Sequence, residues 1–219
     1  LYNKCSVKRK KCLRYATICS NAGFLGNPIA QGVFGMMGLT LASIYLIPQR
    51  IMMWSEGVSV FTEAPTKKEM LKKIFTHPCI IACEIGIVLM LTGWRPPHFL
   101  EETITSVSNC NTAMSMLVIG MILADADPKT IIDKDVLFYT FIRLLIIPFC
   151  VFIPCWLLRI DSLVMGVSVI LAAMPAGATT TILASKYDCE EEFSVKLVVF
   201  STAASLITTP LWNMILLKF

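Results

Sequence analysis

The stretch AAMPAGATTTILASKYD, residues 172–188, decides the fold of this chain. An apolar run enters it as if to continue a membrane helix, but Pro175 and Gly177 interrupt the helical hydrogen-bond pattern, and small or hydroxyl-bearing residues follow at 178–181. Inside hydrocarbon an unpaired backbone N–H or C=O costs several kcal/mol unless the break is buried in protein or lines a wet cavity. The break therefore predicts a polar functional site inside a membrane.

The composition is that of a membrane protein with several spans. The 219 residues are 56% hydrophobic, with a mean hydropathy of +0.70, and 16% are charged, against about 25% in typical soluble domains. The nine cysteines are an odd number and most lie in apolar runs, which favours buried thiols over a disulfide framework. The two histidines offer no metal-binding spacing, so we expect no metal and no cofactor.

Seven apolar segments are long enough to cross a bilayer, which needs about 20 residues per helix. They cover residues 13–36, 40–61, 78–94, 103–124, 136–158, 163–185 and 193–217. The first is interrupted at Asn27 and Pro28, and the sixth at Pro175. The loops on the side of the N-terminal stretch carry thirteen Lys and Arg residues, against three on the other side. The positive-inside rule then places the basic side in the cytoplasm and the C-terminus outside the cell.

The two broken segments run in opposite directions across the membrane, which is the mark of an inverted repeat whose crossed helices hold a substrate between them. The half-helix after Pro28 is expected to present free N–H groups and the positive end of its dipole to the gap, which suits a carboxylate. A lone kink is more often a packing feature. Two kinks in matching positions favour a substrate site.

The segments SNAGFLGNPIAQGVFG (20–35), AAMPAGATTTILASKYD and FSTAASLITTPLW (200–212) resemble the auxin efflux carrier family of membrane transporters, in particular its bacterial permeases. The resemblance implies an all-α polytopic fold with two inverted repeats of five helices and two proline-broken crossover helices. It implies that this chain carries only the last seven helices and is truncated at its N-terminus. Residues 1–61 would then be the C-terminal part of the first repeat, 62–77 a cytoplasmic loop and 78–219 the second repeat.

The resemblance also implies roles for particular residues. Asn21 matches a crossover asparagine at the substrate carboxylate, and Pro28 and Pro175 match crossover prolines. Ser20 and Thr180 stand where the plant carriers have proline, so auxin itself is not assumed as the substrate. The predicted substrate-binding set is Asn21, Asn27, Pro28, Pro175, Thr179, Thr180 and Thr181.

Charged residues within or beside the spans are further candidates, because intramembrane charge is functional by default. Arg50 would pair with an anion or with a carboxylate of a missing helix. Glu84 would be a buried, protonated carboxyl or a coupling group, and Lys186 a gate or an interfacial anchor. Arg143 and Lys196 lie near cytoplasmic ends and are predicted to snorkel.

These patterns predict a secondary transporter, a permease or efflux carrier for a small organic anion that works by alternating access in the plasma membrane. We expect no enzyme and no nucleic-acid partner, whereas a homodimer is compatible with the resemblance. The alternatives are a sodium-coupled symporter resembling the bile-acid carriers and a non-transporting or inactive fragment. An intramembrane enzyme would need paired aspartates, a nucleophile with its base or a His-rich metal motif, none of which falls within the spans.

Overall fold

The computed structural model describes residues 5–53, 57, 59–61, 76, 78–124 and 133–218. Its helices and π-helical turns (η) are α1 (Val7–Ile18), η1 (Ala22–Gly26), α2 (Asn27–Met52), α4 (Pro78–Thr92), α5 (His98–Ala124), α6 (Lys134–Phe141), η3 (Ile142–Ile146), α7 (Ile147–Leu157), α8 (Ser162–Ala172), α9 (Thr179–Lys186) and α10 (Glu191–Leu216). Within these residues no strand forms, and the one β-type pairing is an isolated bridge between Ser20 and Ala176. The predicted all-α class is confirmed.

By length and apolar composition, three helical stretches in the described residues could cross a membrane, namely Ala22–Met52, Lys134–Leu157 and Glu191–Leu216, and the first of them is divided by a turn at Gly35. Helices α8 and α9 are two shorter pieces separated by the predicted break. Many large apolar side chains of α4 and α5 face outward, such as Leu91, Phe99 and Met121. A surface of this kind suits contact with lipid, as expected for a membrane helix.

Both π-helical turns lie directly before a proline at the start of the next helix, Pro28 in α2 and Pro148 in α7. A proline has no N–H to donate, and its ring meets the carbonyl four residues earlier. A turn widened by one residue accommodates both problems without ending the helix. The chain therefore passes these prolines in a continuous helical course.

Helix α2 is in fact two helices that meet at Gly35, where φ is 67° and ψ is −159°. A positive φ of this size is readily adopted only by glycine. After Gly35 the chain turns back and packs closely against the helix before it. A Cβ at Gly38 would lie only 2.5 Å from the carbonyl oxygen of Ala30. The predicted division between the first two spans, near residues 36–40, thus lies at Gly35.

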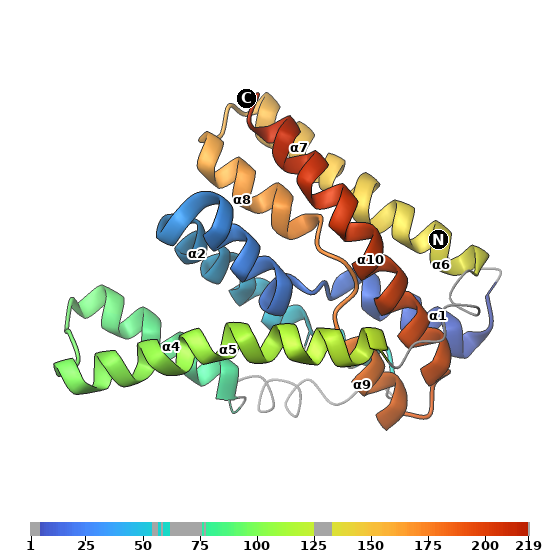
Figure 1. Cartoon of the computed structure of the whole chain (residues 1–219), viewed down its shortest axis with the longest axis horizontal. Helices are drawn as coiled ribbons and strands as arrows, with labels where there is room; N and C mark the ends of the chain where they lie inside the picture. The colour runs from blue at the N-terminus through green and yellow to red at the C-terminus, as the bar shows by residue number, and fades with distance from the viewer. Residues whose placement is uncertain are drawn as a thin grey trace.

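The helices pack around two apolar cores. One core joins α1, α6, α9 and the start of α10 and contains Tyr15, Tyr139 and Leu197. The other joins α2, α8 and the end of α10 and contains Ile170 and Trp212. In Figure 1, α7, α8 and α10 run alongside one another, while α4 and the N-terminal end of α5 extend away and the other end of α5 reaches α10.

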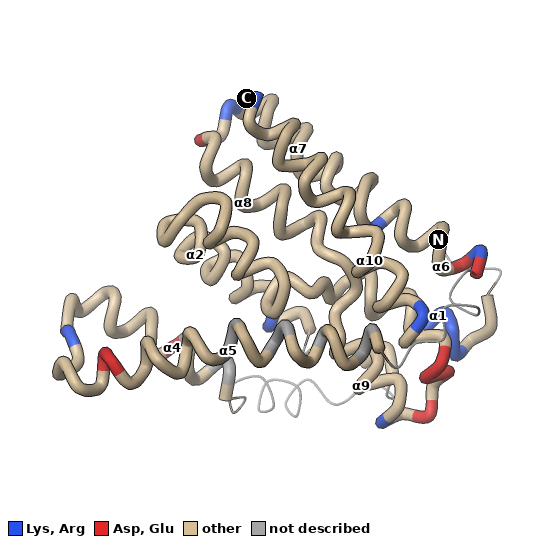
Figure 2. Tube along the Cα trace, viewed as in Figure 1, with Lys and Arg blue, Asp and Glu red and all other residues tan. Residues whose placement is uncertain are grey.

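Charged residues are unevenly distributed along the bundle. Figure 2 shows them gathered about α1 and the neighbouring ends of α6, α9 and α10, with a few more near the C-terminus. A third group lies at the turn between α4 and α5 (Figure 2), and the assignment of these groups to the two sides of the membrane stays a prediction. The predicted cytoplasmic loop 62–77 lies, apart from Thr76, outside the described residues.

Candidate functional site

The two breaks of the chain pair with each other through their backbones. The N–H of Asn21 donates to the carbonyl of Pro175 at 2.8 Å, and the N–H of Gly177 donates to the carbonyl of Cys19 at 3.2 Å. Each break thereby supplies hydrogen-bond partners that its own helix cannot provide. This pairing answers the requirement that backbone groups inside a membrane be satisfied within the protein.

The second break lies where the sequence places it, since α8 ends at Ala172 and α9 begins at Thr179, with Pro175 between them. The predicted interruption at Asn27 and Pro28 is wrong. The helix breaks earlier, between the end of α1 at Ile18 and the start of η1 at Ala22, because the π-helical turn absorbs the proline. The free N–H groups of this half-helix are consequently those near Ala22.

Arg143 ties the two breaks together from the side. Its side chain is buried, with Nε donating to the carbonyl of Met174 at 2.9 Å and Nη1 donating to the carbonyl of Thr17 at 3.1 Å. Both carbonyls lie at the C-terminal ends of half-helices, where a cation is favoured by the helix dipole. The predicted snorkelling of Arg143 is wrong, because the breaks offer it acceptors inside the protein.

Two neutral side chains complete the support of the breaks. Ser201 of α10 accepts the N–H of Ala176 at its hydroxyl, at 3.1 Å. Gln49 of α2 donates its amide to Ser20, at 3.1 Å to the carbonyl and 2.9 Å to the hydroxyl. The crossover is therefore held by polar groups from α2, η3 and α10.

A small cavity of about 20 Å³ lies at the crossover. Its walls come from the first break with η1, from the second half of α2 and from the start of α9. The lining residues are Ser20, Asn21, Gly23, Phe24, Leu46, Gln49, Arg50, Met53, Gly177, Ala178 and Thr179. This volume is enough for about one water molecule, so a larger ligand does not fit at the crossover in this conformation.

The electrostatics of the cavity favour an anion. The first turns of η1 and α9 border it, and the N-terminal ends of helices carry partial positive charge. The side-chain amide nitrogen of Asn21 is buried and finds no partner in the described part of the chain. Arg50 adds a full positive charge, whereas the described lining residues include no Asp or Glu.

An aromatic cluster runs along α9 beside the cavity. The Tyr15 hydroxyl donates to Thr179 Oγ1 at 3.2 Å. The Tyr15 ring lies 5.4 Å from that of Phe61, which stacks in turn on Tyr187 at 5.9 Å. These rings pack the space from the start of α9 to its end.

An ionic cluster lies at the charged end of the bundle. Arg9 of α1 contacts Glu190 at 2.7 Å, Asp133 at 3.0 Å and Asp135 at 3.6 Å. Burial alone would raise the pKa of Glu190, but hydrogen bonds from Arg9 and Ser6 and the charge of Arg9 hold it below its ordinary value. The cluster joins α1 to the starts of α6 and α10.

The structure brings some of the predicted site residues together. Asn21, Thr179 and Arg50 line the cavity, whereas Pro175 does not line it but accepts the N–H of Asn21 at its carbonyl. These positions come from three separate stretches of the chain. Their roles toward a substrate stay predictions.

Four more residues of the predicted substrate-binding set do not line the cavity, namely Asn27, Pro28, Thr180 and Thr181. The Thr180 side chain is fully buried and its hydroxyl finds no partner among the residues described, while the Thr181 hydroxyl donates to Ala178 at 2.7 Å.

The two remaining charged candidates are exposed. Glu84 lies on an outward face of α4, so its predicted burial is wrong. Lys186 lies over the ring of Tyr187, with Nζ 5.7 Å from the ring centroid. Neither is among the residues that line the cavity.

Sequence reasoning missed Gln49, Ser201 and Tyr15 at the crossover. Gln49 carried a usable signal, since it stands beside Arg50 and after Pro48 within an apolar span. Ser201 and Tyr15 carried none, because a hydroxyl can satisfy its own helix and give no sign of a distant partner.

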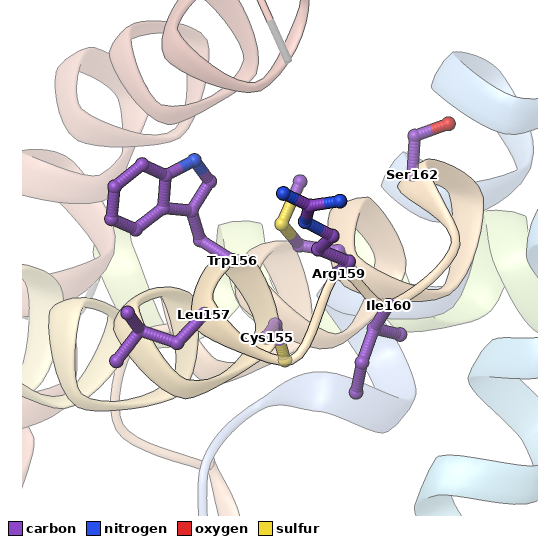
Figure 3. Close-up of a pocket in the computed structure, with 7 residues that line it drawn as sticks. Cys155, Trp156, Leu157, Arg159, Ile160 and Ser162 are labelled. Atoms are coloured by element: carbon purple, nitrogen blue, oxygen red, sulfur yellow. The ribbon is translucent and has the colours of Figure 1, made fainter.

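A larger pocket of about 540 Å³ lies at the turn between α7 and α8 (Figure 3). Cys155, Trp156, Arg159 and Ser162 are among its lining residues. It adjoins the start of α8, whereas the crossover lies beyond the other end of that helix. Exposed Trp and Arg at a helix turn are typical of a membrane interface, and no described side chain of the crossover contributes to this pocket.

Among the described residues no three His, Cys, Asp or Glu side chains could hold a metal ion.

Comparison with known proteins identifies the family. The family model described as "Membrane transport protein" matches residues 61–213. An "Uncharacterized transporter" of Methanothermobacter thermautotrophicus is 27% identical over 93% of this chain and 67% of its own length. The "Uncharacterized transporter YfdV" of Escherichia coli K12 is 21% identical over 87% of this chain and 63% of its own length.

A plant protein also matches. "Auxin efflux carrier component 8" of Arabidopsis thaliana is 24% identical over 66% of this chain and 41% of its own length. The chain spans about two thirds of the length of the archaeal and bacterial relatives. Since the family model covers most of the chain, the chain belongs to the membrane transport protein family, the family of the auxin efflux carriers.

Proposed function

We propose that this chain forms the crossover of a secondary transporter for a small organic anion that works by alternating access. The observation that carries the proposal is the meeting of two broken helices at one polar cavity. Membership of a transporter family supports transport and points away from catalysis. The plasma membrane as location, the C-terminus outside the cell and a homodimer stay predictions.

The charge distribution supports an anion as the substrate. Arg143 already donates to the carbonyls of two helix C-terminal ends, so its charge has partners. The two N-terminal ends, the amide nitrogen of Asn21 and the guanidinium of Arg50 face a cavity without a described acidic residue. A carboxylate would satisfy these donors, whereas an apolar substrate would leave them desolvated and unpaired.

The size of the cavity supports a closed state of the transport cycle. About 20 Å³ admits one water and no organic anion, so binding requires the walls to separate. The walls belong to half-helices joined by a few backbone hydrogen bonds and to the second half of α2. Movement of these walls against the rest of the protein would open the cavity to one side of the membrane at a time.

The test uses Asn21→Ala in the complete protein, reconstituted in liposomes with a proton or a sodium gradient. Uptake of labelled pyruvate and labelled malonate is measured, with Asn213→Ala as the matched control, an asparagine of α10 outside the cavity lining. We expect Asn21→Ala to lower uptake by about tenfold or more, as for loss of one hydrogen bond to a charged group. Undiminished uptake by Asn21→Ala would refute the proposed site. A dependence on sodium alone would favour the sodium-coupled alternative.

A further inference from the structure

We propose that Arg50 is the specificity-determining residue of this site and that it selects substrates with a single carboxylate group. The inference rests on the proposed function and assigns its charge selectivity to one side chain. Arg50 lies on the second half of α2, after the turn at Gly35, so a separate element brings it to the crossover.

The guanidinium of Arg50 lies against the first turn of η1. A Cβ at Gly23 would be 2.7 Å from Arg50 Nη2 and 3.7 Å from Cζ. Only the absence of a side chain at Gly23 leaves room for this contact. The guanidinium thereby lies at the wall of the cavity, which Asn21 also lines.

This position is electrostatically unfavourable for a cation on its own. Cations are stabilised at the C-terminal ends of helices, and Arg143 follows that rule with its two carbonyl partners. Arg50 instead packs on an N-terminal turn, close to the start of α9 as well. In the described part of the chain its guanidinium has no hydrogen bond and no ion pair. Three sources of positive potential thus converge, and the described residues provide no counter-charge to them.

A bound carboxylate would supply that counter-charge. The planar guanidinium can donate two parallel hydrogen bonds to one carboxylate, a geometry that a lysine cannot reproduce. The described lining holds one guanidinium and no second cation, so it offers a full counter-charge to one carboxylate and only the partial charges of the helix ends to a second one. Phe24, Leu46 and Met53 form an apolar part of the wall, which suits the uncharged body of a monocarboxylate.

The experiment compares Arg50→Gln and Arg50→Lys with the parent in the complete protein in liposomes. The probes are labelled pyruvate as the monocarboxylate, unlabelled malonate as a dicarboxylate competitor and pyruvamide as a neutral competitor. Arg159→Gln is the matched control, because Arg159 is an exposed arginine in the turn between α7 and α8.

We expect both Arg50 variants to raise the KM for pyruvate by roughly 10- to 100-fold, with a smaller change in maximal rate. Pyruvamide should gain strength as a competitor relative to pyruvate in Arg50→Gln, a change that a merely structural role would not produce. The Arg159→Gln control should keep the parent's KM. Gly23→Ala, which displaces the guanidinium but keeps its charge, should raise the KM in the same direction and serves if Arg50→Gln fails to fold.

The outcomes separate the two proposals. A parent protein that takes up neither pyruvate nor malonate overturns the proposed function, and the role of Arg50 with it. If the parent carries these anions, the role of Arg50 alone is overturned by an unchanged KM in Arg50→Gln. An unchanged KM in both Arg50→Lys and Gly23→Ala has the same meaning. Preference of the parent for malonate over pyruvate overturns the selection of a single carboxylate.

Discussion

Replacement of Arg143 by methionine tests whether this side chain holds the crossover. Methionine is unbranched and apolar, so it fills much of the space but donates no hydrogen bond. The change removes the bonds to Met174 at 2.9 Å and to Thr17 at 3.1 Å. A hydrogen bond to a charged group contributes about 1.5–3 kcal/mol, so the two together predict a loss of about 3–6 kcal/mol in the free energy of unfolding.

The assay is the thermal unfolding midpoint of the purified complete protein. For a chain of about this length each kcal/mol corresponds to roughly 2–4 °C, so Arg143→Met should lower the midpoint by about 6 °C or more. Arg143→Lys should recover part of the loss, because one ammonium cannot reproduce the two-pronged contact. Arg159→Met, at an exposed position, should stay within about 0.5 kcal/mol of the parent. A midpoint for Arg143→Met as high as that of Arg159→Met would refute the reasoning.

Two further predictions concern the charged end of the bundle and the turn in α2. Against the effect of burial, Arg9 holds the pKa of Glu190 below its ordinary value of 4.5, so their pairing stabilises the fold above that pH and the stabilisation is lost as the pH falls further. Thermal midpoints measured from pH 7 to pH 3 should show the parent losing its small advantage over Glu190→Gln only below about pH 4.5; an equal difference at all pH values would contradict this. Gly38→Ala should destabilise the protein by about 1–3 kcal/mol, because the new Cβ would lie 2.5 Å from the backbone oxygen of Ala30. Gly32→Ala, with nothing within 4 Å of its Cβ, is the matched control, and equal midpoints for the two variants would disprove the tight return of the chain.

The second break was predictable because its signal is local. Pro175 and Gly177 stand inside an apolar run, and a proline there removes a donor that the surrounding hydrocarbon cannot replace. The last span was predictable for a similar reason, since the apolar run at 193–217 corresponds closely to α10, which begins at Glu191. Features of this kind can be predicted from the residues of the segment itself.

The first break was misplaced because proline has two outcomes in a membrane helix. Pro28 stands in a segment that looks as strongly interrupted as the second one, yet a π-helical turn accommodates it. The true break, ahead of Ala22, contains no proline of its own. It exists because the partner segment at Pro175 supplies backbone hydrogen bonds across 154 positions of sequence. Such a long-range contact leaves no local pattern.

The site itself was predictable only where a residue is unusual for its surroundings. Arg50 attracted attention as a charge inside a span, and the structure places it at the cavity. Arg143 is equally unusual, but it lies near the predicted cytoplasmic end of a span, so its side chain was expected to reach the membrane surface. In the fold the side chain is buried instead. The threonines after the second break could not be distinguished by sequence, and only Thr179 among them lines the cavity.

The bridge between Ser20 and Ala176 bears on how the specificity of such a site can change through substitutions. Its hydrogen bonds join main-chain atoms, so they place little demand on which side chains occupy those positions beyond room for close approach. The frame of the crossover and the chemistry of its lining can therefore vary independently of each other. A substitution at the lining can alter what is recognised while the joint between the half-helices stays intact, which gives one scaffold access to many ligands.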